Sequence, residues 1–531
     1  MSQINVNDLT FYYDGSYDNI FENVSFQIDT DWKLGFIARN GRGKTTFLRL
    51  LQGKYEYKGT ISSSVSFNYF PFEISDHQKD TLAVVEEIYP DYEFWKVCRE
   101  LTLLQVDTEV LYRPFDTLSN GEQTKVMLAI LFSGENSFLL IDEPTNHLDM
   151  PTRKLVSDYL NKKKGFLLVS HDRAFLDQCI DHVLTINKTN IEIQKGNFSS
   201  WWENKRRQDE YEIAENENLK KDIQRMKESA RQSREWADNV EATKIGKKSQ
   251  DQEKNIDSRA YIGEKSRRMQ MRRKNMERRQ DRSIEEKSAL LKNIESTESL
   301  KLFPLRHHKD VLVRMEEVGI TYCSCQYSPG DNDLQSITDK CGGKEKQVVH
   351  NFNLEIRNGE KIVLEGKNGC GKSSIIKSIL SSVDWSFDDS MDEDKENNRI
   401  LTGSIETAGG LIISYVPQDT SHLKGTISSY AERYGIDETI FKTLLRKLDF
   451  SRLQLEKSME EYSGGQKKKV LIARSLCQQA HLYVWDEPLN FIDVFSRIQI
   501  EELIEKYNPT LLMVEHDRTF VEKIGAKIIT L

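Results

Sequence analysis

Several features are scarce in this 531-residue chain, and each scarcity narrows the protein classes it can belong to. The sequence has 7 cysteines and 10 prolines, and it contains no run of about 18 apolar residues of the kind that crosses a membrane. The odd, scattered set of cysteines predicts reduced thiols rather than a disulfide framework. The N-terminus lacks the basic start and apolar core of a signal sequence, so we expect a cytoplasmic protein that does not enter a membrane.

Positive charge is also in short supply. The chain has 75 Lys+Arg against 84 Asp+Glu, a formal net charge of -9 at pH 7. A uniformly basic nucleic-acid-binding protein is therefore excluded, and any such contact must come from a local patch. Hydrophobic residues at 38% and charged residues at 30% indicate a folded, helix-rich chain rather than a disordered one.

One module occurs twice in the sequence. Four blocks of the first half return in the same order in the second: GRGKTT (41–46) as GCGKSS (369–374), SNGEQ (119–123) as SGGQK (463–467), IDEPTNHLD (141–149) as WDEPLNFID (485–493), and SHDRAF (170–175) as EHDRTF (515–520). Short apolar runs such as KLGFIA and KIVLEG alternate with helical stretches in both copies. This pattern predicts α/β domains with a largely parallel central sheet, at 1–200 and 307–531, joined by a linker at 201–306.

The second copy carries two insertions, at 323–347 and 384–399, which we interpret as surface loops without assigning them a role. The first insertion contains Cys323, Cys325 and Cys341. Three thiols do not complete a four-ligand zinc set, so a plain loop is favoured over a metal site.

Both copies have a phosphate-binding loop between a strand and a helix. GKNGCGKS (366–373) matches G-x-x-x-x-G-K-[ST], in which backbone N–H groups cradle phosphates, the lysine reaches the β and γ oxygens, and the hydroxyl binds Mg²⁺. The first copy has Ala38 where the pattern has its first glycine. The expected ATP-binding residues are Asn40, Gly41, Gly43, Lys44, Thr45 and Thr46 in the first loop and Gly366, Asn368, Gly369, Gly371, Lys372, Ser373 and Ser374 in the second, with Thr45 and Ser373 also contacting the metal.

Two further blocks supply candidate catalytic groups. Each third block places an Asp-Glu pair at the carboxyl end of a strand, where parallel sheets bind their ligands. The aspartate can hold Mg²⁺ through water and the glutamate can polarise the attacking water. A histidine follows the next strand of each copy, positioned to contact the γ-phosphate. The candidates are Glu143, Glu487, His171 and His516 for catalysis and Asp142 and Asp486 for the metal.

With a phosphate loop, S-G-G-Q, D-E-P and a following histidine, the chain resembles an ATP-binding cassette (ABC) ATPase duplicated in one polypeptide. In that family two cassettes pack head to tail, and each ATP lies between one phosphate loop and the signature of the other cassette. The resemblance implies ATP and Mg²⁺ as cofactors and hydrolysis of ATP to ADP and phosphate. By the same resemblance, the loop of Lys44 works with Ser463 and Gly465, and the loop of Lys372 works with Ser119 and Gly121.

The resemblance also exposes differences between the copies. Tyr13 and Tyr322 would stack on adenine, with a core aromatic as the alternative. Gln418 is similar to the family's metal-sensing glutamine, whereas the parallel position is Phe72, which cannot ligate Mg²⁺, and Asn120 replaces a signature glycine. We therefore predict two unequal ATP sites, of which the first loop's site is the slower.

The segment 203–303 between the copies is rich in Glu, Lys, Arg and Gln and lacks proline. Apolar residues recur at helical spacing at both ends of this segment: Leu219, Ile223 and Met226 on the way out, and Leu290, Leu291 and Ile294 on the return. The spacing predicts a helical hairpin, whose arms of about 30 residues would each extend roughly 45 Å. Residues 231–280 carry 15 Lys+Arg and 8 Asp+Glu, a local +7, densest at 267–279. Such a hairpin suits contacts with phosphate backbones, and a solvated spacer is the alternative.

Two cassettes, a charged helical linker and no membrane segment are together similar to the ABC-F proteins, translation ATPases that bind the ribosomal tRNA exit site. The linker tip at 241–263 and the sequence segments NGRGKTT, RPFDTLSNGE and NFSSWW are similar to those of the Lsa/Vga-type branch, which protects ribosomes from lincosamides, pleuromutilins and streptogramin A. The resemblance implies a monomer with paired cassettes whose partners are the 50S subunit, its rRNA and P-site tRNA. The alternatives are a housekeeping translation factor, a transporter's ATPase subunit and a DNA-repair ATPase.

Overall fold

The computed structural model describes residues 2–13, 19–134, 136–145, 148–187, 190–244, 271, 274, 278, 300–323, 345–367, 369–383 and 399–531. They form two compact units, one of Met1–Trp201 with Thr297–Leu531 and one of Trp202–Ser296. The first unit contains both copies of the repeat, called here the first and second modules. The finer boundaries at 1–200, 201–306 and 307–531 stay predictions.

The first module is built on a six-stranded sheet of order β5–β6–β7–β3–β8–β9. Neighbouring strands are parallel except for the β8–β9 pair at one edge. The strands are β3 (Lys33–Ile37), β5 (Ser66–Phe70), β6 (Ser137–Asp142), β7 (Phe166–Val169), β8 (His182–Asn187) and β9 (Asn190–Lys195). An antiparallel sheet of order β2–β1–β4 accompanies it, made of β1 (Gln3–Phe11), β2 (Phe21–Asp29) and β4 (Lys58–Ser62).

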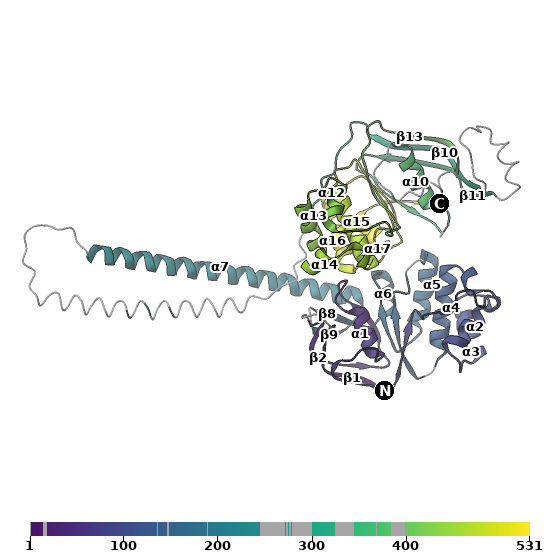
Figure 1. The fold of residues 1–531 in the computed structure, drawn as a ribbon, viewed down its shortest axis with the longest axis horizontal. Coiled ribbons are helices and arrows are strands. Elements are labelled where there is room, and N and C mark those ends of the chain that lie inside the picture. The colour runs from purple at the N-terminus through teal and green to yellow at the C-terminus, as the bar shows by residue number, and fades with distance from the viewer. Residues whose placement is uncertain are drawn as a thin grey trace, which may run out of the picture. The chain divides into compact units, whose positions relative to one another are not determined.

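The second module repeats this plan (Figure 1). Its central sheet is wholly parallel, in the order β14–β15–β16–β12–β17. The strands are β12 (Lys361–Glu365), β14 (Ile413–Val416), β15 (Leu482–Asp486), β16 (Leu511–Val514) and β17 (Lys527–Thr530). The antiparallel sheet has the order β11–β10–β13, from β10 (Val311–Cys323), β11 (Glu345–Arg357) and β13 (Arg399–Thr407). The predicted α/β class with a mainly parallel central sheet is confirmed in both modules.

Helices lie between these strands and close the cores. Those of the first module are α1 (Lys44–Leu51), α2 (Thr81–Ile88), α3 (Phe94–Leu103), α4 (Asn120–Ser133), α5 (Met150–Asn161) and α6 (Arg173–Cys179). Those of the second are α10 (Lys372–Ser381), α12 (Ile427–Arg433), α13 (Glu438–Lys447), α14 (Arg452–Glu456), α15 (Gly464–Cys477), α16 (Val494–Tyr507) and α17 (Arg518–Ile524).

Continuous apolar strands sit at the centre of each core. β7 (FLLV) and β16 (LLMV) are buried along their whole length, because a parallel sheet is covered on both faces. In the first module one cluster joins Phe36 of the central sheet to Phe47 of α1 and to Val6 of the antiparallel sheet. The loop before α1 is thereby anchored on both sides.

The second unit contains most of α7 (Phe198–Lys244), a helix of 47 residues. At 1.5 Å per residue it is about 70 Å long, longer than the arm expected from the sequence. Salt bridges one turn apart stabilise it, such as Lys205–Asp209 at 3.0 Å and Arg206–Glu210 at 2.9 Å. The return segment with Leu290, Leu291 and Ile294, and the tip beyond Lys244, lie outside the described residues, so the hairpin stays a prediction.

No helix among the described residues is both long and apolar enough to cross a membrane. Cys325 and Cys341 lie outside the described residues, as do most of the insertions at 323–347 and 384–399. Within the described part of the chain, no group of three or more His, Cys, Asp or Glu side chains is arranged to hold a metal ion.

Candidate functional site

Each phosphate loop joins an interior strand of a central sheet to a helix, β3 to α1 and β12 to α10. The last glycine of each loop has a left-handed backbone, with φ of 89° at Gly43 and 103° at Gly371. A Cβ atom on Gly43 would lie 2.5 Å from Ile20, and one on Gly371 would lie 2.5 Å from Val349. Only glycine fits there, and it lets backbone N–H groups of the helix start face a ligand.

The loop lysines fold over their own loops. Lys44 Nζ donates to Ala38 O at 2.9 Å and lies 3.4 Å from His171 Nε2, while Lys372 Nζ donates to Gly366 O at 2.8 Å. Burial lowers the pKa of Lys44, and the nearby Asp493 carboxylate of the second module is the largest opposing influence. Both ammonium groups therefore lie against their own loops. Asn368 of the second loop lies outside the described residues.

Two hydroxyl groups converge on Asp142 in the first module. Thr45 Oγ1 and Tyr69 OH approach the same Asp142 oxygen, Oδ2, at 3.5 Å and 3.0 Å. The Glu143 backbone is left-handed, with φ of 50°, and Glu143 Oε1 lies 3.3 Å from His171 Nε2. Burial, helped by the neighbouring Asp142 charge, raises the pKa of Glu143 to about 8. Burial, helped by the Lys44 charge, lowers the pKa of His171 well below its ordinary value, so this histidine is neutral.

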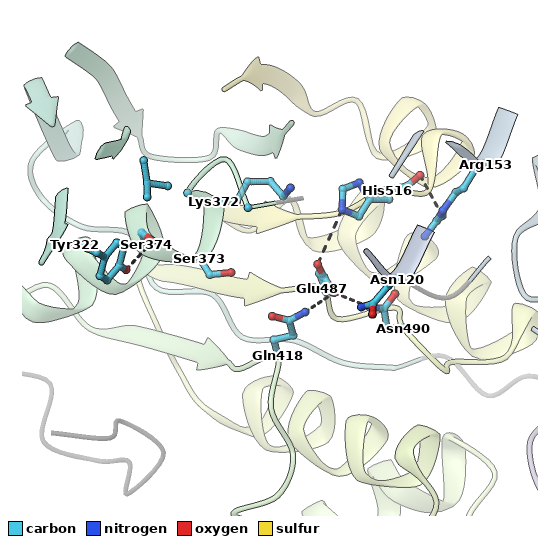
Figure 2. Close-up of a pocket in the computed structure, with 13 residues that line it drawn as sticks. Asn120, Arg153, Tyr322, Lys372, Ser373, Ser374, Gln418, Glu487, Asn490 and His516 are labelled. Carbon is cyan, nitrogen blue, oxygen red and sulfur yellow. Dashed lines mark hydrogen bonds and ion pairs between the residues drawn. The ribbon is translucent and has the colours of Figure 1, made fainter. Parts of the chain in front are cut away.

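A cavity of about 490 Å³ marks the second site (Figure 2). Three side chains approach the Glu487 carboxylate: Gln418 Nε2 and Asn490 Nδ2 donate to Glu487 Oε2 at 2.8 Å and 2.7 Å, and His516 Nε2 lies 3.9 Å from Oε1. The lining residues come from both modules: Asn120 and Arg153 from the first, and Tyr322, Val348, Gly369, Gly371, Lys372, Ser373, Ser374, Gln418, Glu487, Asn490 and His516 from the second.

The donors at this cavity fit a hard divalent cation beside a polyphosphate. Burial raises the pKa of Asp486 to about 6, while a hydrogen bond with Ser373 opposes that rise. Asp486 Oδ1 is buried and has no hydrogen-bond partner among the described residues. Hydroxyl, carboxylate and amide oxygens are the ligands Mg²⁺ prefers. Burial lowers the pKa of His516 to about 4, so it is neutral near pH 7 and can accept or donate through its ring nitrogens.

The signature serines begin the two helices that face across the modules. Ser119 caps α4 in a capping box with Glu122, and Ser463 caps α15 in one with Gln466. A helix start of this kind carries partial positive charge that suits a phosphate. The cavity beside Lys372 reaches Asn120, the residue between Ser119 and Gly121.

The first phosphate loop meets the opposite signature. Asn40 Nδ2 donates to Phe491 O at 2.8 Å, and a Cβ on Gly465 would be 2.7 Å from that same Asn40 nitrogen. Arg39 and Arg42 of the loop lie 3.5 Å and 3.6 Å from one Asp449 oxygen. The structure thus brings each loop near the signature segment of the other module.

The two tyrosines lie beside the phosphate loops. Tyr13 OH is 2.7 Å from Thr46 Oγ1, and Tyr322 OH is 2.8 Å from Ser374 Oγ. Tyr13 is 41% exposed, so it is not a core aromatic, and Tyr322 lines the cavity. Both hydroxyl groups tie their rings to the start of the helix that follows the loop.

The sheet register identifies the residue of the first module that is equivalent to Gln418. Phe70 pairs with Ile141 just before Asp142, as Val416 pairs with Trp485 just before Asp486. Phe72 and Gln418 therefore both stand two residues beyond equivalent strand ends. An aromatic ring cannot supply the amide oxygen that Gln418 offers, which makes the two sites chemically unequal.

Sequence reasoning missed several residues that contact across the modules. Arg153 Nη1 reaches His516 O at 3.4 Å while holding Asp172 at 3.2 Å. Arg173 forms a buried ion pair with Glu501. Arg153 follows Asp149 by four residues, as Arg497 follows Asp493, so extending the third repeated block by four positions finds that pair. Nothing in the repeat predicts Glu501, because the first module has Ser157 at the matching position.

Comparison with known proteins agrees with this geometry. The family model described as "ABC transporter" matches residues 21–146 and 349–490. Ribosome protection protein VmlR from Bacillus subtilis (strain 168) is 26% identical over 518 residues, covering 96% of this chain and 84% of that protein. ABC transporter F family member 2 from Arabidopsis thaliana is 24% identical, covering 99% of this chain and 76% of that protein.

Solved structures show the same fold. The crystal structure of the complex of archaeal ribosomal stalk protein aP1 and archaeal ribosome recycling factor aABCE1 matches with a TM-score of 0.56 at 17% identity, over 98% of this chain and 87% of that one. RNase-L Inhibitor matches with a TM-score of 0.55 at 17% identity, over 99% and 87%. With two matched cassettes, paired phosphate loops and signature helices, the chain belongs to the ATP-binding cassette family, as an ABC-F ATPase that uses ATP and Mg²⁺.

Proposed function

We propose that this ATPase binds the ribosome and protects the peptidyl-transferase centre from antibiotics of the lincosamide, pleuromutilin and streptogramin A type. The observation that carries the proposal is the tandem pair of cassettes with a separate unit, Trp202–Ser296, between them. A relative named a ribosome protection protein matches 96% of the chain across that whole arrangement. The domains are proposed to be 1–200, 201–306 and 307–531.

In the proposed ATP cycle, each nucleotide lies between one phosphate loop and the opposite signature. Lys44 and Lys372 hold the β- and γ-phosphates, and the adenines stack on Tyr13 and Tyr322. The remaining ATP contacts come from the other loop residues and from the signatures: Asn40, Gly41, Gly43, Thr45 and Thr46; Gly366, Asn368, Gly369, Gly371, Ser373 and Ser374; and Ser119, Gly121, Ser463 and Gly465.

Hydrolysis is assigned to the carboxylates at the strand ends. Glu143 and Glu487 orient the attacking water, and His171 and His516, both neutral, contact the γ-phosphate. When bound, Mg²⁺ neutralises charge on the β- and γ-phosphate oxygens. The residues proposed to hold it, partly through water, are Thr45, Asp142, Ser373, Gln418 and Asp486.

ATP binding at both sites is proposed to close the cassettes on each other, and the closed form fits the tRNA exit site of the 50S subunit. The linker, with its tip at 241–263, then displaces or distorts the end of the P-site tRNA and the drug pocket, so that the drug leaves by a steric or an allosteric route, and hydrolysis releases the protein. Basic residues at 267–279 supply contacts with rRNA phosphates. The protein acts in this proposal as a cytoplasmic monomer whose two cassettes pair within the chain.

Ribosome co-sedimentation of the Glu143→Gln, Glu487→Gln variant tests the proposal. This variant should pellet with ribosomes in ATP and stay in the supernatant in ADP, because it binds ATP without hydrolysing it. If the variant binds ATP but does not pellet with ribosomes in low salt, the protein does not bind the ribosome and the proposal is wrong.

A charge variant tests the linker. Changing five arginines within 267–279 to glutamine should make ribosome binding less sensitive to salt. The slope of the logarithm of the binding constant against the logarithm of salt concentration should decrease by up to roughly one for each lost phosphate contact. Arg206→Gln with Arg207→Gln on α7 is the matched control, because these arginines are exposed and already paired with Glu210 and Glu203. Equal effects of both sets would argue against a specific role for 267–279.

Drug protection is separated from housekeeping translation by a cell-free assay. Added protein should restore translation inhibited by a lincosamide, a pleuromutilin or a streptogramin A, and deletion of 241–263 should abolish the rescue while leaving ATPase turnover. Ribosome binding without rescue from any of the three drug classes would favour a housekeeping translation factor.

A further inference from the structure

Lys468 on α15 is a buried cation that makes no direct ion pair among the described residues. Its side chain is 2% exposed, and its ammonium donates to two backbone carbonyl oxygens, Pro417 O at 2.8 Å and Asp486 O at 3.3 Å. The next residue, Lys469, is equally buried but is held by the Asp493 carboxylate at 2.6 Å. A buried ammonium normally requires such a partner, so the position of Lys468 calls for an explanation.

The two carbonyls that Lys468 holds immediately precede two side chains with proposed roles at the second site. Pro417 is followed by Gln418, and Asp486 is followed by Glu487. These two side chains are bonded to each other, Gln418 Nε2 to Glu487 Oε2 at 2.8 Å, at the wall of the cavity (Figure 2). Lys468 thus joins, from behind, the peptide units that carry both partners of that bond.

The backbone at Glu487 is held through the peptide unit that precedes it. Its φ is 47°, in the left-handed region that costs free energy for a residue with a side chain. Its N–H is bonded to Val514 O at 3.1 Å, and Lys468 fixes the carbonyl on the preceding residue. A carboxylate that orients water must be held within a fraction of an ångström, so support from behind bears directly on turnover.

The first module has neither part of this arrangement. Thr124 stands where the second module has Lys468, and its hydroxyl is used within its own helix, donating to Asn120 O at 2.9 Å. Phe72 stands where the second module has Gln418. A lysine and a glutamine are therefore both present in one module and both missing from the other.

We infer that Lys468 is a positioning residue for the second ATP site, which sets Gln418 and Glu487 in their working geometry and so makes this site the faster of the two. It acts through the backbone and touches no reacting atom. Carbonyl–ammonium contacts of this kind fix both peptide units at once without occupying the cavity. The inference rests on the roles proposed for Gln418 and Glu487, and it does not depend on the ribosome.

Each site can be tested separately in a variant with the other glutamate disabled. In Glu143→Gln, which leaves turnover at the second site, Lys468→Met should lower kcat by about tenfold or more while the KM for ATP changes by less than about twofold, since only geometry is lost. In Glu487→Gln, which leaves the first site, the same change should alter kcat by less than about twofold. Equal losses at both sites would show a general structural role and overturn the inference.

Two measurements other than turnover accompany this comparison. A fluorescent ATP analogue should bind the Lys468→Met variant with unchanged affinity in EDTA but with a smaller gain in affinity on adding Mg²⁺, because Gln418 is no longer held at the metal. Lys506→Met, which removes an exposed lysine of the same module, is the charge control. If the variant loses affinity equally with and without Mg²⁺, the inference fails.

A double-variant cycle decides whether the effect passes through Gln418. In the Glu143→Gln background, Lys468→Met should lower kcat less in a chain that already has Gln418→Ala than in one that keeps Gln418, because only the part of the effect that passes through Glu487 is left. If the kcat losses of Lys468→Met and Gln418→Ala simply multiply in the double variant, Lys468 does not act through Gln418 and the inference fails. If Glu143→Gln with Glu487→Gln retains full turnover, the proposed role of the glutamates is wrong, and that result is distinguishable from a failure of Lys468.

Discussion

The buried pair of Arg173 and Glu501 predicts how strongly the two modules are held together. Glu501 is fully buried on α16, and both of its oxygens are bonded to the Arg173 guanidinium of the first module, with Oε2 3.2 Å from Nη1. Lys523 Nζ also lies 2.9 Å from Glu501 Oε2. Removing one partner of a buried pair leaves the other charge without compensation, which costs roughly 3 to 5 kcal/mol.

The perturbation is Glu501→Gln, which keeps the shape of the side chain and removes its charge. At roughly 2 to 4 °C per kcal/mol for a module of this size, a loss of about 3 kcal/mol lowers the apparent Tm by roughly 6 to 12 °C. The assay is thermal unfolding of the purified chain followed by circular dichroism. Arg518→Met is the control, because Arg518 occupies the matching position of the second module but is exposed and bonded only to Glu522 among the described residues; its Tm should be nearly unchanged.

A double variant separates the charge effect from lost packing. Arg173→Met with Glu501→Met removes both charges and should be more stable than Glu501→Gln alone, since a buried pair replaced by apolar groups is often neutral. A Glu501→Gln Tm within about 2 °C of the parent chain would show that this pair is solvated and does not hold the two modules together.

Three further predictions concern the ATP sites. Glu487→Gln should lower total turnover more than Glu143→Gln, because the first site has Phe72 in place of a glutamine; equal losses would contradict the inequality. In Glu487→Gln, kcat/KM should rise from pH 6 and level off above about 8, because Glu143, with its pKa raised to about 8, acts as a base only when ionised; a flat profile would refute this. Adding Tyr69→Phe to the Glu487→Gln variant should raise the Mg²⁺ concentration needed for half-maximal turnover by about two- to tenfold, which corresponds to the loss of one hydrogen bond to Asp142. An unchanged Mg²⁺ requirement would show that this hydrogen bond does not contribute to metal binding.

Local sequence predicted most of what the fold confirms. Four blocks that each occur twice predicted the two α/β modules. The last glycine of each phosphate loop is required because a Cβ there would collide with Ile20 or Val349. These features depend on residues close in the chain or on a pattern repeated in it. The same holds for Phe72, which the sheet register places at the position in the first module that is equivalent to Gln418 in the second.

Contacts between distant segments could not be predicted in this way. The bond from Asn40 to Phe491 O joins residues 451 positions apart, and it depends on how two modules pack rather than on any local pattern. Lys468 and Lys469 are adjacent and look alike in sequence, yet Lys468 is bonded to two carbonyls, whereas Lys469 is bonded to one carbonyl and to the Asp493 carboxylate. Tertiary placement alone distinguishes them.

The matching positions Ser157 and Glu501 also determine which halves of this protein could recognise each other if separated. In a pair of two first halves, Arg173 of each copy would have no carboxylate partner, because Ser157 stands at the position of Glu501 and its Oγ is bonded to Gln178 at 2.7 Å. Two copies of the second half would each offer Glu501, already neutralised within its own half by Lys523. Only the mixed pair matches Arg173 with Glu501, so complementary charge at one point selects the heterodimer and makes exchanged or duplicated halves poor substitutes for the intact chain.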